Sequence, residues 1–299
     1  NREDTRSMMF LFGHHYPTIS VKDKEMAKNL ISVLFDFQEP RLDLSLAAWE
    51  GYITNSLYAN PFRELEFVYS KAIDIKRAQY TPREYFGDLD DVLATHLALA
   101  YMHFPDITLQ SALLKKFFEE KSIKRHTEFI SFLGRYIVSR NDAKKWMREN
   151  SIQDAKKLEE FWDWILDQNL DPKVYEAFGF WADAEWGVFD LVWQAEHVKR
   201  TLEKTNGAIE WDHNLQDSLV VYAQASPKNT LEIARLYFLN YLALRAENQG
   251  WIHTDEKIIE AFRLLHQNPE TKEETEELIN ALLPHGNGVF WKLKDILKK

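Results

Sequence analysis

The chain has 299 residues, of which 45% are hydrophobic and 14% aromatic, and its formal net charge is −10. This apolar content is enough for a sizeable core without disulfides or metal ions. The sequence contains no cysteine, which excludes disulfides, thiolate zinc sites and a cysteine nucleophile and suits the cytoplasm. The negative charge argues against a protein that coats nucleic acid without sequence preference, because such binding relies on clustered lysine and arginine.

Residues 1–20 form an N-terminal segment that begins polar, becomes apolar at Met8–Phe12 and then contains Gly13 and Pro17. Because glycine and proline are typical of loops, we expect little regular structure here. The chain starts at Asn1 without a signal-peptide pattern. We expect either a processed start or a piece of a longer polypeptide.

Residues 21–299 predict a succession of helices, because apolar residues recur every three or four positions. Pro, Gly, Asn and Asp residues separate these segments and mark where helices begin and end. The expected helices cover residues 21–37, 43–58, 65–76, 88–104, 108–120, 122–139, 142–149, 154–167, 171–181, 182–202, 215–224, 226–250, 254–267, 271–283 and 289–298. Strand patterns are nearly absent. The fold class is therefore all-α, with about fourteen helices and little or no β-structure.

The clearest of these helices covers residues 226–250. Ser226 is a good N-cap residue, Pro227 fits the first helical position, and Gly250 can close the helix. Its apolar residues are spread around more than one face, so we expect neighbouring helices to cover it on several sides. Charged residues such as Glu232 and Arg235 interrupt the apolar run, which argues against a membrane span.

Short connections between the helices favour an irregular array of antiparallel helical hairpins, either an α-solenoid or a compact multi-helix domain. The loop-like residues 203–214 offer a possible subdivision of the array 21–299. No tetratricopeptide or ankyrin signature recurs. The helix-pair rhythm is similar to the degenerate HEAT-type repeat class, at the level of pattern over most of residues 21–299. This resemblance implies a helical array and no catalytic residues.

Two stretches have opposite charge. Residues 115–149 carry ten bases and five acids, whereas residues 255–277 carry eight acids and three bases. Either stretch can be an ordinary solvated helix face. The basic stretch also provides candidate partner-binding residues, namely Lys115, Lys116, Lys124, Arg125, Lys144 and Lys145.

Ten aromatic residues fall between Phe161 and Trp193. Helical spacing places most of them in the core, although such a density can also line a binding groove. Trp164 and Trp181 fit the buried faces least well. We therefore expect these two to be exposed and to anchor a partner.

Candidate catalytic and metal-binding groups have simpler explanations. His14 and His15 are adjacent and lack a companion ligand at helical spacing. The cluster Asp88, Asp90 and Asp91 precedes a helix, where carboxylates act as caps. Sequence neighbours such as Glu196 and His197 do not by themselves present both side chains to one substrate. No phosphate loop, dinucleotide fingerprint or nucleophile elbow occurs, so we predict no metal and no cofactor.

These observations favour a non-catalytic helical scaffold that binds a protein partner, or another domain of a longer chain, as in bacterial regulatory or defence proteins. One alternative is an enzyme or small-molecule receptor with a pocket between helices. A second alternative is single-stranded nucleic-acid binding through residues 115–148.

Overall fold

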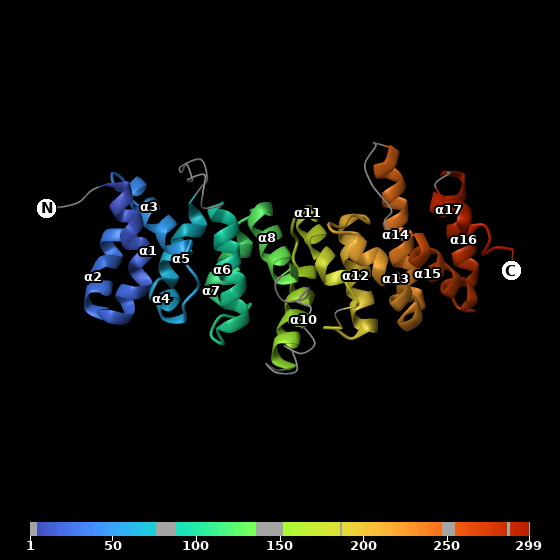
Figure 1. Ribbon diagram of the computed structural model, residues 1–299, viewed down its shortest axis with the longest axis horizontal. Helices are drawn as coiled ribbons and strands as arrows, with labels where there is room; N and C mark the ends of the chain where they lie inside the picture. Colours follow the sequence, from blue (N-terminus) through green and yellow to red (C-terminus); the bar gives the residue numbers. More distant parts are fainter. Residues whose placement is uncertain are drawn as a thin grey trace. The chain divides into compact units, whose positions relative to one another are not determined.

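The computed structural model describes residues 5–75, 88–135, 152–185, 187–246, 255–285 and 288–298. Within these ranges the chain forms sixteen α-helices, two 3-10 helices and no strand (Figure 1). The all-α prediction is therefore confirmed. The chain divides into two compact units, residues Asn1–Phe129 (unit 1) and Ile130–Lys299 (unit 2). The subdivision expected near residues 203–214 stays a prediction.

Unit 1 consists of successive short helices. They are α1 (Arg6–Lys22), α2 (Lys24–Leu34), α3 (Leu42–Ile53), α4 (Ala59–Glu64), α5 (Glu66–Asp74), α6 (Leu89–His103), α7 (Ala112–Glu119) and α8 (Ile123–Leu133), the last of which continues past the unit boundary. Helix α1 packs on α2, α3 and α4, while α3 packs on α6 and α5 on α7.

Helix α1 contradicts the expectation that residues 1–20 have little regular structure. The Thr5 hydroxyl caps it by accepting a hydrogen bond from the Met8 amide. A Cβ at Gly13 would lie 1.8 Å from the carbonyl oxygen of Ala48, and one at Gly51 would lie 2.0 Å from that of Phe10. The two glycines thus allow α1 and α3 to approach closely, and Gly13 is a packing residue rather than a turn residue.

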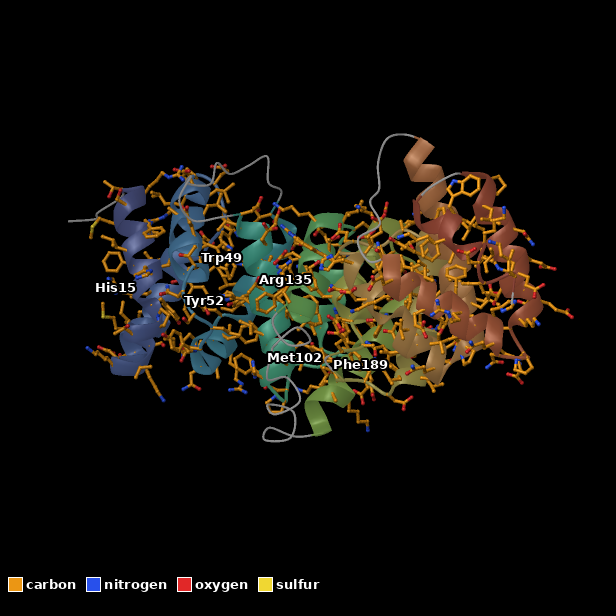
Figure 2. The ribbon with its side chains drawn as sticks, turned by 45° about the vertical axis from the view of Figure 1, so that its right-hand side comes forward. His15, Trp49, Tyr52, Met102, Arg135 and Phe189 are labelled. Atoms are coloured by element: carbon orange, nitrogen blue, oxygen red, sulfur yellow. The ribbon has the colours of Figure 1, made fainter. Side chains whose placement is uncertain are left out.

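Aromatic side chains from several helices meet in the core of unit 1. The Trp49 ring centroid lies 5.0 Å from that of Tyr69, and the Tyr16 centroid lies 6.0 Å from that of Tyr52 (Figure 2 labels Trp49 and Tyr52). Both contacts are edge-to-face, the arrangement that the ring quadrupoles favour. Trp49, Tyr52 and Tyr69 lie in the expected helices 43–58 and 65–76, whereas Tyr16 joins this core from a segment that was expected to be irregular.

Unit 2 contains the remaining helices. They are α10 (Ile152–Leu166), α11 (Pro172–Tyr175), the 3-10 helix η3 (Glu176–Ala182), α12 (Leu191–Thr205), α13 (His213–Ala225), α14 (Pro227–Ala246), α15 (Asp255–Gln267), α16 (Lys272–Leu282), the 3-10 helix η4 (Leu283–His285) and α17 (Gly288–Leu293). From α12 onward each helix packs on the next but one, since α12 contacts α14, α13 contacts α15, α14 contacts α16 and α15 contacts α17.

Helix α14 begins at Pro227, as predicted. Leu231, Ile233, Tyr237 and Phe238 are buried at 3% exposure or less, and α12, α13, α15 and α16 all contact this helix. The expectation that neighbours cover it on several sides is confirmed; its predicted end at 247–250 lies outside the described residues. No helix in the described ranges has the length and apolarity needed to cross a membrane.

Candidate partner-binding site

Two of the lysines proposed as partner-binding residues, Lys116 and Lys124, are engaged within unit 1. Lys116 Nζ lies 2.6 Å from both the Ser70 carbonyl oxygen and Asp74 Oδ2. Lys124 pairs with Asp88 and lies 3.4 Å from Asp91. Lys115 is exposed, and Lys144 and Lys145 lie outside the described residues. Of the three described candidate lysines, two are therefore paired with acids of unit 1 and one is exposed.

Arg125 lies in the interior rather than on a surface. Its side chain is 6% exposed, and Nε donates to Asp90 Oδ1 at 2.8 Å. Its terminal nitrogens donate to Glu120 Oε2 and to the carbonyl oxygens of Ile73 and Ile75. The guanidinium holds several helix ends together, so Arg125 cannot contribute to an exposed cationic edge, contrary to expectation.

Trp181 was expected to be exposed, and this is wrong, because its side chain is fully buried. Its Nε1–H donates to the Ile130 carbonyl oxygen at 3.1 Å, and its ring lies parallel to that of Phe189. The reason is that rings from other elements cover Trp181: Phe161 and Trp162 of α10 and Phe189 all meet its indole, with centroids 5.5 to 5.9 Å apart. Spacing within the segment that carries Trp181, the 3-10 helix η3, does not reveal these contacts. Trp164 in α10 is half-buried.

An acid and a histidine do meet in unit 2, at His197 of α12. Its Nε2 lies 2.7 Å from Asp163 Oδ1 and its Nδ1 lies 2.8 Å from the Trp193 carbonyl oxygen. The imidazole stacks on the Trp193 indole with centroids 3.6 Å apart, and the Trp162 indole meets it edge-on. Both ring nitrogens thus have partners within the fold. Glu196 pairs with Lys199 instead, so the sequence neighbours Glu196 and His197 do not act together.

In unit 1, His96 is equally enclosed. Its Nε2 lies 3.0 Å from the Asn55 carbonyl oxygen and its Nδ1 lies 2.8 Å from the Tyr69 hydroxyl. Burial lowers the pKa of His96 to about 4, although the hydrogen bond to Asn55 works in the opposite direction. The neutral ring donates from Nε2 and accepts from Tyr69, so it forms part of a buried hydrogen-bonded chain.

A different tryptophan, Trp211, is half exposed. Its side chain keeps 50% of its accessible surface, and its ring centroid lies 5.1 Å from that of the half-buried Phe180. The exposed His213 meets the indole edge-on. We call Phe180, Trp211 and His213 the Trp211 step. Sequence reasoning missed it, because the loop-like residues 203–214 were considered only as a subdivision.

The loop that carries the Trp211 step is fixed at two close backbone contacts. A Cβ at Gly179 would lie 1.5 Å from the Glu210 carbonyl oxygen, and one at Gly207 would lie 2.2 Å from the Leu236 carbonyl oxygen. The Glu210 amide donates to the Glu176 carbonyl oxygen at 2.9 Å. Trp211 itself has φ +54°, the left-handed conformation that bulky residues rarely adopt. The surrounding contacts therefore fix the backbone that carries the indole.

Acidic residues flank the Trp211 step. Glu210 and Asp212 are its sequence neighbours, and Asp212 Oδ2 accepts from the Tyr237 hydroxyl at 2.7 Å. Lys173 lies 2.5 Å from Glu176 and 3.5 Å from Glu210. The hydrogen bond to Glu176 is the largest influence that raises the pKa of Lys173. These pairs hold the base of the loop but leave the indole face uncovered.

Comparisons with protein families, with curated proteins and with solved structures found no match to this chain. The similarity to the HEAT-type class therefore stays an expectation. Among the described side chains, no group of three or more histidines and carboxylates is arranged to hold a metal ion.

Proposed function

We propose that the chain is a non-catalytic helical scaffold that binds a protein partner through the Trp211 step of unit 2. The observation that carries this proposal is the combination of 50% exposure and left-handed backbone at Trp211. A non-glycine residue in this conformation costs on the order of 1–3 kcal/mol and persists only where its surroundings impose it. Such strain is typical of residues with a function.

An indole that is held in place before binding is well suited to a protein interface. Tryptophan offers a large apolar surface and one hydrogen-bond donor, and it is enriched among the residues that dominate binding energy. Because the loop is already ordered by Gly179 and Gly207, little conformational entropy is lost on binding. Asp212 beside it accepts from the neutral Tyr237 hydroxyl and so keeps its negative charge, which favours a partner surface that carries positive charge.

The rest of the architecture supports the same proposal. Helices that pack on their next-but-one neighbour in unit 2 are typical of HEAT-like hairpin arrays, which present surfaces whose residues are free to vary. The absence of cysteine in the whole sequence suits the reducing cytoplasm. We include both the repeat architecture and the cytoplasmic location in the proposal.

Site-specific photo-crosslinking in the source cells tests this proposal. A benzoylphenylalanine at position 211 should give a discrete adduct with one protein, which mass spectrometry identifies and which is then purified. The matched control is position 192, because Val192 is also an apolar side chain of unit 2 with 50% exposure. An identical adduct pattern at positions 211 and 192, or no adduct at 211, would contradict a specific site at Trp211.

A further inference from the structure

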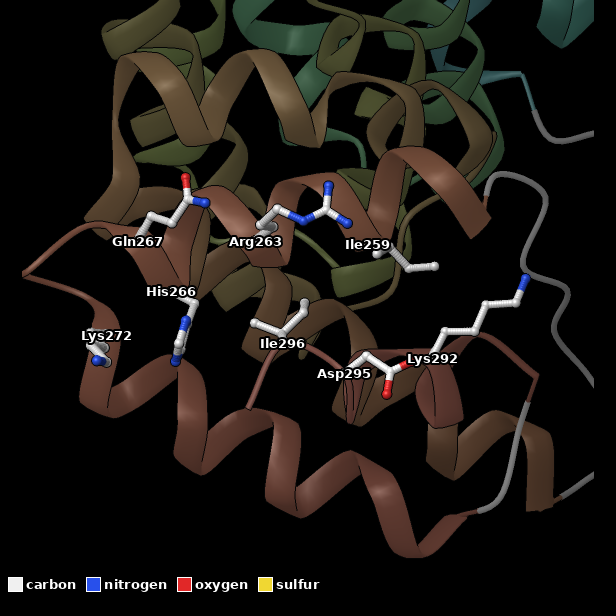
Figure 3. A pocket seen from close by; sticks show the side chains of 8 residues that line it. All are labelled: Ile259, Arg263, His266, Gln267, Lys272, Lys292, Asp295 and Ile296. Atoms are coloured by element: carbon white, nitrogen blue, oxygen red, sulfur yellow. The ribbon is translucent and has the colours of Figure 1, made fainter. Parts of the chain in front are cut away.

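Unit 2 contains a second feature, a cleft of about 380 Å³ between α15, α16 and the residues around the end of α17. Ile259, Arg263, His266 and Gln267 of α15 line one side of it, and Lys272, Lys292, Asp295 and Ile296 complete it (Figure 3). In Figure 3, Ile296 lies in the middle of this group, with Lys272 and Lys292 on opposite sides. We call it the α15–α16 cleft.

The cleft is lined mainly by basic side chains, although the surrounding sequence is acidic. Residues 255–277 contain eight acids and three bases. Two of the three bases, Arg263 and Lys272, line the cleft, whereas none of the described acidic side chains of this stretch does. Lys292 adds a third permanent cation and Asp295 is the one lining acid. A cleft with a cationic lining is therefore embedded in an acidic region of an acidic protein.

The lining cations can bind a ligand while they keep their present contacts. Arg263 pairs with Glu260, and His266 Nε2 lies 2.9 Å from Glu276 Oε1, but neither acid lines the cleft. A guanidinium has five donors and an ammonium has three, so one carboxylate does not use them all. The buried Ile296 and the half-buried Ile259 supply an apolar surface between the cations.

We propose that the α15–α16 cleft binds a small organic anion, with its phosphate or carboxylate group on the lining cations and its apolar body against Ile259 and Ile296. A volume of about 380 Å³ is within the range of small-molecule sites. The proposal does not depend on the Trp211 step, since the two features share no residue.

Titration of the full chain with four probes tests the proposal, with binding followed by ¹H–¹⁵N correlation spectra. The probes are hexyl phosphate, hexanoate, inorganic phosphate and hexylammonium. For ligands of this size we expect a dissociation constant on the order of 1 mM for hexyl phosphate. Hexanoate should bind at the same residues, inorganic phosphate more weakly because it lacks the apolar body, and hexylammonium not at all.

Substitutions then locate the site. Lys272→Ala and Lys292→Ala should each weaken hexyl phosphate binding by up to about fivefold, and the double Lys→Glu variant should abolish it. The control is Lys156→Ala, a lysine of α10 with 70% side-chain exposure, which should leave the affinity unchanged. Three results would overturn the proposal: hexylammonium binds as well as hexyl phosphate, inorganic phosphate binds as tightly as hexyl phosphate, or Lys156→Ala weakens binding as much as Lys272→Ala. Absence of binding by both organic anions at tens of millimolar would overturn it too.

Discussion

Arg125 and Asp90 form a buried ion pair in unit 1, with Arg125 Nε 2.8 Å from Asp90 Oδ1 and side-chain exposures of 6% and 17%. The same guanidinium donates to the carbonyl oxygens of Ile73 and Ile75, at the C-terminal end of α5. A cation is favourable there because the free carbonyl groups of a helix end carry partial negative charge. Arg125 therefore connects α8 to the ends of α5 and α6.

Replacement of Arg125 by alanine should lower the free energy of unfolding by about 3 kcal/mol, because it leaves Asp90 and the Ile73 carbonyl group buried without this partner. Urea denaturation checks this value. The control is Lys115→Ala, an exposed lysine nearby in the sequence, which should change stability by less than about 0.5 kcal/mol. Equal effects of the two substitutions would show that Arg125 is not a structural clamp.

Stability should fall as the pH decreases from about 6.5 to about 4. The pKa of His96 is about 4 in the folded protein and near 6.5 in the unfolded chain, so the unfolded chain binds more protons in this interval. The loss attributable to His96 is roughly 3 kcal/mol when the pH has passed below 4. Burial also lowers the pKa of His126, which acts in the same direction.

Denaturation of the His96→Gln variant at several pH values isolates this contribution. Glutamine keeps a donor for Asn55 and an acceptor for Tyr69, and it does not titrate. The slope of unfolding free energy against pH reports how many protons the chain takes up on unfolding. Between pH 4 and 6.5 this number should be lower by about one in the variant. An unchanged slope would mean that His96 does not remain neutral in the folded protein.

The two tryptophans proposed from sequence should differ in their effect on stability. Trp181→Phe removes the indole donor to the Ile130 carbonyl oxygen and leaves space in a fully buried cluster, so it should cost about 2 kcal/mol. Trp164→Phe, at a half-buried position, should cost less than about 1 kcal/mol. Denaturation midpoints of both variants provide the comparison, and a larger cost at Trp164 would contradict the burial of Trp181.

Most of the helices could be predicted from the sequence, because a stripe of apolar residues at helical spacing reflects the burial of one face. The start of α6 is an example, since Asp88 Oδ1 accepts from the Asp90 amide as the capping pattern predicts. The prediction fails where one residue type has two uses. Gly13 was interpreted as a loop residue, but it permits close packing of α1 on α3.

The candidate site could not be predicted because it depends on backbone geometry. The burial of Trp181 depends on the rings of Phe161 and Trp162 in α10, which helical spacing around residue 181 does not reveal. The loop that carries Trp211 depends on the close approach of Gly179 to the Glu210 carbonyl oxygen, and these two residues are distant in the sequence. Likewise, the pairing of Lys116 with Asp74 depends on how α5 and α7 pack, and composition does not reveal it.

Gly179→Ala should disturb the loop that carries Trp211. The added methyl group has no space against the Glu210 carbonyl oxygen, so the free energy of unfolding should decrease by about 2 kcal/mol. The indole N–H resonance of Trp211, assigned through the Trp211→Phe variant, should shift at the same time. If the variant is as stable as the natural protein and the resonance does not move, Gly179 does not fix the orientation of Trp211.

The most direct test of the central claim is the affinity of the purified crosslinked partner for the natural chain and for two single variants, measured by calorimetry. Trp211→Ala should raise the dissociation constant by roughly thirtyfold, the effect expected of a residue that dominates an interface, while Val192→Ala leaves it unchanged. Both substitutions are at half-exposed positions, so circular dichroism should show the same fold in each. A dissociation constant that is the same for Trp211→Ala as for the natural chain would contradict the claim that this partner binds through Trp211.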